Sequence, residues 1–182
     1  MDTLKKNIVE LTHCSVSEYK GLRKLPLRVL TDNVRSMYNI GAIFRTSDAF
    51  LVDEIILAGI SGRPPHPEIA KTALGAEETV AWRHVDDAVA EVECLKKEGW
   101  KVCSLEQAHG SVSLDCFSPS VNDRYLLVVG NEVEGVNQNI VDMSDVILEI
   151  PQHGVKHSLN VSSSASIALW YFFSAMRGMI EI

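Results

Sequence analysis

Short apolar runs recur along this chain, and they lack the apolar-polar alternation of a half-buried strand. The clearest are LRVLTD at 27–32, EIILAG at 54–59, WKVCSL at 100–105 and RYLLVVG at 124–130. Strands that are buried on both faces have this composition, whereas strands with one solvated face alternate. The pattern therefore predicts an α/β fold, with a mostly parallel sheet covered by helices on both faces.

The segments between these runs have helical spacing. Helices are expected at 40–50, 67–74, 86–99, 137–144 and 158–178, with one or two more in 3–20, and further strands at 78–85 and 145–151. Asp86 is expected to cap the helix at 86–99, and Gly99 to end it. Three prolines in 61–68 predict a loop.

The bulk properties fit one soluble domain spanning 1–182, because 182 residues suffice for a full core and no linker is apparent. No apolar run approaches the roughly 18 residues of a membrane span, and the N-terminus lacks the apolar region of a signal peptide. The four cysteines form no C-x-x-C pair, which argues against a disulfide framework and a zinc site; they are Cys14, Cys94, Cys103 and Cys116. A cytoplasmic location is expected.

Charge is distributed unevenly. The net charge is −7, yet residues 1–45 hold eight basic and four acidic residues, a balance of +4, and the remainder has a balance of −11. A basic end on an acidic body suits a polyanion that touches one face. A solvated basic helix would give the same composition, so charge alone leaves both interpretations open.

The stretch YLLVVGNEVEGVN at 125–137 places two glycines directly after an apolar strand. A phosphate-binding loop would take this position, but Glu132 and Glu134 would repel a phosphate and no Lys or Arg is present. The spacing matches neither G-x-G-x-x-G, which argues against a nucleotide-dependent dehydrogenase, nor a P-loop. Taken alone, the loop could be any tight turn.

Two further loops carry polar residues at the expected ends of strands, where parallel sheets bind ligands. In the first, Asn39 and Gly41 precede Arg45, whose fork could face a phosphate, although a surface arginine would give the same pattern. In the second, Ser158-Leu159-Asn160 precedes a run of small residues at 162–166. The histidines of 150–160 and elsewhere lack metal-ligand spacing, so no metal site is predicted.

Together, N-x-G-x-x-x-R, G-N-E-x-x-G-V and S-L-N-V-S in this order resemble the TrmH (SpoU) family of the SPOUT methyltransferase superfamily over about residues 27–176. The resemblance implies a deep trefoil knot at about 125–176, a homodimer, and transfer of a methyl group from S-adenosylmethionine to a ribose 2′-hydroxyl of tRNA or rRNA. Residues 1–24 would form a helical extension. Larger members of the family carry a separate N-terminal RNA-binding domain that this sequence lacks, which favours a small target such as a tRNA loop, or help from a partner. The alternative is a non-catalytic RNA-binding module on the same fold.

The family pattern also assigns residues. Arg45, Asn39, Glu132, Ser158 and Asn160 match its catalytic positions, and backbone around Ser104, Leu105, Gly130, Ile150 and Leu159 would hold the cofactor. This cofactor carries a sulfonium cation and no phosphate, so an acidic glycine loop need not repel it. RNA backbone contacts are expected from Lys5, Lys6, Lys20, Arg23, Lys24 and Arg28.

Overall fold

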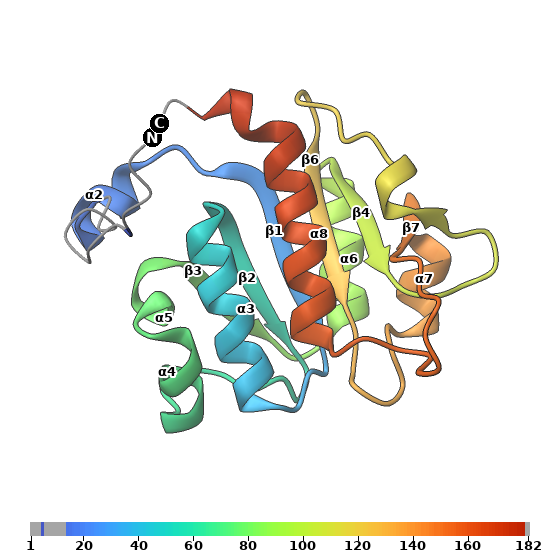
Figure 1. Cartoon of the computed structure of the whole chain (residues 1–182), viewed down its shortest axis with the longest axis horizontal. Helices are drawn as coiled ribbons and strands as arrows, with labels where there is room; N and C mark the ends of the chain where they lie inside the picture. Colours follow the sequence, from blue (N-terminus) through green and yellow to red (C-terminus); the bar gives the residue numbers. More distant parts are fainter. Residues whose placement is uncertain (1–4, 6–13, 181–182) are drawn as a thin grey trace.

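A seven-stranded sheet forms the centre of the computed structural model, which describes Lys5 and residues 14–180. The strands are β1 Leu25–Asp32, β2 Val52–Ala58, β3 Ala81–Val85, β4 Trp100–Leu105, β5 Val112–Ser113, β6 Arg124–Val129 and β7 Val146–Glu149. Their order is β3-β2-β1-β6-β4-β7-β5, and every neighbouring pair is parallel. All the strands therefore end at one edge of the sheet (Figure 1).

Helices cover both faces of this sheet. On one face lie α3 Met37–Ala49 and α8 Val161–Met176, with α4 Pro67–Ala73 and α5 Ala76–Thr79 beside α3; on the other lie α6 Ala88–Lys97 and α7 Gln138–Met143. Short helices complete the chain: α2 Val16–Gly21, η1 Leu114–Cys116 and η2 Arg177–Met179. Each face has its own buried apolar cluster. The predicted mostly parallel sheet with two helical layers is confirmed.

Several predicted boundaries were wrong. Asp87, and not Asp86, caps α6, because its carboxylate accepts the N–H groups of Val89 and Ala90 at 2.9 and 3.1 Å. Residues 76–79, predicted in part as strand, form α5, and β5 was not predicted. Of the helices expected in 3–20, α2 is present, while 3–4 and 6–13 lie outside the described residues.

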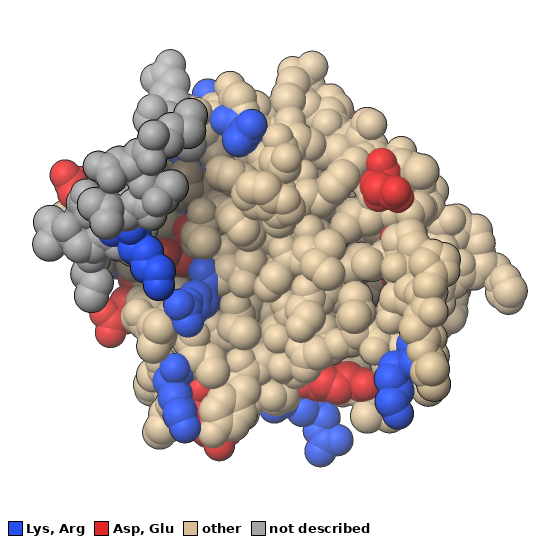
Figure 2. Space-filling model, in the orientation of Figure 1, with Lys and Arg blue, Asp and Glu red and all other residues tan. Residues whose placement is uncertain are grey.

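The surface over α8 carries few charged groups (Figure 2). Ile167 and Trp170 on this helix are 43% and 52% exposed. Trp170 packs against Phe50 and Phe173, with ring centroids 5.6 and 5.9 Å apart. An aromatic surface is thus left open beside α3, whereas Lys, Arg, Asp and Glu lie mostly towards the margins of the view.

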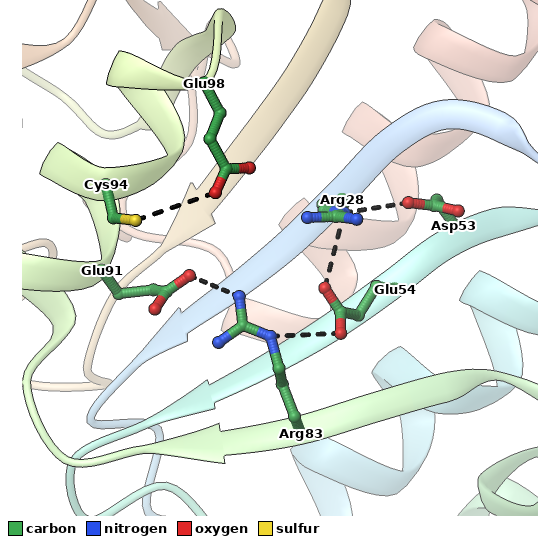
Figure 3. A network of polar contacts seen from close by, with 7 residues as sticks. All are labelled: Arg28, Asp53, Glu54, Arg83, Glu91, Cys94 and Glu98. Carbon is green, nitrogen blue, oxygen red and sulfur yellow. Dashed lines mark hydrogen bonds and ion pairs between the residues drawn. The ribbon is translucent and has the colours of Figure 1, made fainter.

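An ion-pair network ties β1, β2 and β3 to α6 (Figure 3). Arg28 Nε lies 2.9 Å from an Asp53 carboxylate oxygen and 3.4 Å from Glu54. Glu54 also lies 3.2 Å from Arg83, which contacts Glu91 on α6. The guanidinium group of Arg28, which was predicted to contact RNA, is therefore paired with two carboxylates. This network lies on the back of the sheet, the face that α6 covers.

Candidate functional site

A cavity of about 840 Å³ opens at the edge where the parallel strands end. Its walls come from the loops after β4, β6 and β7 and from the start of α8. Four of the five residues assigned to the cofactor line it: Leu105, Gly130, Ile150 and Leu159. Ser104 does not, because its buried hydroxyl lies 2.7 Å from Ser144 Oγ beneath the cavity. A volume of this size is typical of small-molecule sites.

The glycine loop after β6 folds tightly back on itself. The N–H of Asn131 donates to the carbonyl of Gly135 at 2.9 Å, and the reverse bond is 3.0 Å. A Cβ on Gly130 would lie 2.1 Å from the backbone of Gly135 and Val136, so only glycine fits there. This close approach, rather than phosphate binding, explains the first glycine of the motif.

Two carboxylates that the sequence analysis missed hold this loop in place. Asp32, 2% exposed at the end of β1, accepts the N–H of Asn137 at 2.7 Å. Glu106, directly after β4, accepts the N–H of Val136 at 3.0 Å. Each is an acidic residue at the end of an apolar run, and that position is the feature of the sequence that could have identified it. Both therefore support the cavity wall from neighbouring strands.

Glu132, from the glycine loop, binds the beginning of α3. Its carboxylate accepts the backbone N–H groups of Arg35 and Ser36 at 3.2 and 3.0 Å, and Asn39 Nδ2 at 3.0 Å. Negative charge at a helix N-terminus is stabilised by the unpaired N–H groups there. Glu132 thus joins the first and second motifs directly.

The third motif joins the same cluster through Asn160. Its Nδ2 donates to Asn39 Oδ1 at 3.1 Å. Its own Oδ1 accepts the N–H groups of Ser162 and Ser163, at 2.9 and 3.3 Å, and so caps α8. Helix-capping and contact with Asn39 therefore use different atoms of one side chain.

The electrostatics of Glu132 follow from this geometry. Partial burial acts to raise its pKa, but the hydrogen bonds from its own backbone, Asn39, Ser36 and Arg35 outweigh that effect and hold the pKa below its ordinary value. Glu132 is therefore an anion at neutral pH. An anionic hydrogen-bond acceptor fixes the orientation of the Asn39 amide, so its Oδ1 is available to Asn160.

The other predicted catalytic residues lie around this cluster without joining it. Ser158 lines the cavity. Arg45 is exposed on α3, six residues past Asn39, which is about 9 Å along the helix axis. Gly41 lies inside α3, where a Cβ would come within 2.5 Å of the Ile69 carbonyl. The motif glycine therefore allows α4 to pack closely on α3.

The predicted RNA contacts are dispersed. Lys5, Lys20 and Arg23 are exposed, and Lys6 lies outside the described residues. Lys24 donates to the carbonyl of Tyr19 at 2.5 Å and lies over its ring. Within the described residues, no helix is long and apolar enough to cross a membrane, and no group of three His, Cys, Asp or Glu side chains could hold a metal ion.

Comparisons with known proteins agree on one family. Residues 26–170 match the SpoU rRNA Methylase family. The tRNA (guanosine(18)-2'-O)-methyltransferase of Aquifex aeolicus is 32% identical over 151 residues, covering 81% of this chain and 69% of that protein. The curated relatives are longer, and this chain spans 59% to 69% of their length.

Solved structures give the same result. The crystal structure of the A. aeolicus TrmH/SpoU tRNA modifying enzyme superimposes with a TM-score of 0.80 at 27% identity, covering 90% of this chain and 83% of that one. An AdoMet-bound rRNA methyltransferase from Sinorhizobium meliloti gives 0.77 at 25% identity, covering 90% and 61%. The family expected from the three motifs is confirmed.

Proposed function

The chain belongs to the SpoU rRNA Methylase family, and from this premise we propose that it transfers a methyl group from S-adenosylmethionine to a ribose 2′-hydroxyl of RNA. The observation that carries the proposal is the convergence of Asn39, Glu132 and Asn160 beside the cavity. The helix after β1 and the loops after β6 and β7 bring these side chains together. A ligand held in the cavity would therefore lie next to a fixed set of amide and carboxylate groups.

The cavity lining fits S-adenosylmethionine. Leu105, Ile150 and Leu159 provide an apolar wall suited to adenosine, and Gly130 lines the cavity beside them. Glu106 and Glu134 also line the cavity and suit a ligand that carries a sulfonium and an ammonium group. When bound, the cofactor supplies a methyl carbon that is already activated by its positive sulfur.

The chain's own residues then have two tasks: they hold the ribose hydroxyl in line with that carbon and they help its proton to leave. Asn39, fixed by Glu132 and Asn160, and the Ser158 hydroxyl can orient the ribose. A guanidinium group does not give up its proton in proteins, so Arg45 would be a poor base. In our proposal it binds the adjacent phosphate and lowers the hydroxyl pKa electrostatically, and the proton leaves to phosphate or water.

We also propose that residues 125–176 form the knot that the family resemblance implies. The strand order supports it, because β7 lies between β4 and β5, which are consecutive in the chain. The chain enters β7 from α7 on one face of the sheet and leaves it towards α8 on the other. A segment that crosses from one face to the other beside the loop that connects β4 to β5 would be threaded as the proposed knot requires.

A homodimer is part of the proposal. The open aromatic surface of α8, with Ile167 and Trp170 at its centre, would be covered by a second copy. Arg45 lies on the neighbouring helix α3, which contacts α8 through Thr46 and Ser166, whose hydroxyl oxygens are 3.0 Å apart. The dimer contact would thus adjoin the reaction centre.

For the substrate, we favour tRNA over rRNA. The relatives named above act on either, so the names do not decide. Of the two solved structures described above, the tRNA-modifying enzyme is the more similar, with a TM-score of 0.80 against 0.77, and this supports the choice of tRNA. Exposed Lys5, Lys20 and Arg23 would contact RNA phosphates.

The experiment that tests the function begins with titration calorimetry of S-adenosylmethionine. Wild type should bind saturably, and Leu159→Trp should not, because Leu159 lines the cavity. Val155→Trp is the matched control, since Val155 is 99% exposed. Labelled methyl transfer to total tRNA and rRNA, followed by mapping of 2′-O-methyl positions, then identifies the acceptor. Absence of both binding and transfer would favour the non-catalytic RNA-binding module.

A further inference from the structure

Two arginines follow a backbone contact between two loops at the strand-end edge. Arg35 is in the loop after β1, and Arg63 is in the loop after β2. The N–H of Gly62 donates to the carbonyl of Val34 at 3.1 Å, which joins the two loops one residue before each arginine. A Cβ on Gly62 would lie 2.3 Å from Met37 Sδ, so the loops are packed closely. The backbone thus holds the two arginines as neighbours.

This pair adjoins the cavity. The backbone N–H of Arg35 donates to Glu132 at 3.2 Å, and Glu132 lines the cavity. The same carboxylate binds Asn39, so the position of Arg35 is fixed relative to the polar cluster. A group that is bound by the Arg35 side chain would therefore lie beside the proposed reaction centre.

Both guanidinium groups are exposed, and among the residues that the structure describes neither forms an ion pair. Arg28 and Arg83, on the back of the sheet, are held by carboxylates instead. In a chain of net charge −7, two arginines that none of the described carboxylates engages leave positive charge available to a polyanion. Lys and Arg side chains, with Asp and Glu side chains beside them, are visible along the lower edge of the molecule in Figure 2.

We propose that Arg35 and Arg63 form a phosphate clamp for the RNA strand that delivers its ribose to the cavity. This inference rests on the proposed function and names how the same site receives its substrate. The cavity lining includes Glu106, Glu132 and Glu134, which repel phosphate, so the RNA backbone has to pass beside the cavity and not through it. A guanidinium fork matches a phosphate with two parallel hydrogen bonds.

The clamp differs from the other cationic groups in its geometry. Arg45 lies on α3, eight residues past Met37, which is about 12 Å of helix rise from the start of that helix, and the basic N-terminal residues precede β1. Within the described residues, the side chains of Arg35 and Arg63 form no hydrogen bond with the glycine turn or with the aromatic surface of α8. Removing their charge should therefore leave the cofactor site intact.

The test uses fluorescently labelled bulk tRNA and anisotropy titrations at several KCl concentrations. Arg35→Ala and Arg63→Ala should each weaken binding about tenfold, and each should reduce the slope of log K against log[KCl] by about 0.9. Lys97→Ala is the control, because Lys97 is a 79% exposed cation on α6, on the other face of the sheet. Arg63→Lys should retain the slope but lose part of the affinity, because an ammonium cannot form the fork.

Affinities within twofold of wild type and unchanged slopes for both alanine variants would overturn the clamp, as would absence of tRNA binding by the wild type. Calorimetry with S-adenosylmethionine separates this result from the proposed function. If the cofactor binds and RNA is methylated while both variants keep the wild-type KM for RNA, the clamp fails and the function stands. If the cofactor does not bind but RNA affinity depends on Arg35 and Arg63, the function fails, and the two arginines remain an RNA contact without a role in methyl transfer.

Discussion

Asn39 and Glu132 are 93 residues apart in sequence, yet Asn39 Nδ2 lies 3.0 Å from Glu132 Oε1. The other end of the same amide accepts a hydrogen bond from Asn160. One side chain thus connects the helix after β1 with the loops after β6 and β7. A substitution at Glu132, Asn39 or Asn160 should therefore affect the positions of the other two side chains.

Glu132→Gln removes the charge that faces the N-terminus of α3. The pKa of Glu132 is below its ordinary value of 4.5 in the folded protein, so its contribution to stability is present above pH 4.5 and is lost as the pH falls through the folded pKa. Because the side chain is exposed, we expect a loss below about 1 kcal/mol at pH 7. Urea unfolding from pH 7 to pH 3 should show the two proteins converging in acid.

Glu134→Gln is the control for that series, since its carboxylate has no hydrogen-bond partner within the described residues. The free energy of unfolding of Glu134→Gln should match that of wild type at every pH. A stability difference for Glu132→Gln that remained constant down to pH 3 would contradict the electrostatic explanation.

Gly130→Ala should disrupt the glycine loop. The added Cβ would meet the backbone of Gly135 and Val136 at 2.1 Å, and backbone atoms cannot move aside as a flexible side chain can. We expect a loss of about 2 kcal/mol or more in the free energy of unfolding and loss of cofactor binding. Gly154→Ala, where nothing lies within 4 Å, should leave both within error of wild type. Equal stability and equal cofactor binding of the two variants would contradict the prediction, because the glycine loop would then have moved to make room for the added Cβ.

Arg45→Ala should lower kcat for RNA methylation by about a hundredfold while changing the affinity for S-adenosylmethionine less than twofold, because Arg45 does not line the cavity. Arg45→Lys keeps the charge but cannot bind phosphate through two parallel hydrogen bonds, so it should restore only part of kcat. Single-turnover rates and calorimetry measure the two effects. Full activity in Arg45→Lys would contradict the two-pronged phosphate contact.

Trp170→Asp should convert the proposed dimer to monomer, because it places a charge in the centre of the apolar surface of α8, where Trp170 is 52% exposed. Light scattering coupled to size-exclusion chromatography measures the mass. Val155→Asp changes a 99% exposed residue away from α8 and should keep the wild-type mass. A wild type that is monomeric at micromolar concentration would refute the dimer.

Much of the fold was predictable from local sequence, because a strand buried on both faces leaves an uninterrupted apolar run. The run at 124–130 identified β6 at 124–129 almost to the residue. β5 could not be found in this way, since two residues carry no periodicity and Val112 pairs only with Leu148, far along the chain. Asp86 and Asp87 are equivalent as local capping signals, and only the backbone geometry distinguishes them.

The identity of the residues in the site was also predictable, but the contacts that bring them together were not. The motifs identified Asn39, Glu132 and Asn160, yet their mutual hydrogen bonds depend on how three strands are ordered in the sheet. Gly41 was interpreted as part of a helix start, whereas its role is set by the carbonyl of Ile69 on another helix. Tertiary contacts of this kind leave no periodic signal in the sequence.

Asn160→Asp separates the two functions of Asn160. An aspartate still accepts the N–H groups of Ser162 and Ser163, so α8 remains capped. It cannot donate to Asn39 Oδ1, and two acceptors would then face each other where a 3.1 Å hydrogen bond was. We therefore expect kcat to fall at least tenfold with little change in cofactor affinity. Asn160→Ala should lose about 1 kcal/mol of stability as well, and if Asn160→Asp kept full activity, the contact with Asn39 would be irrelevant to catalysis.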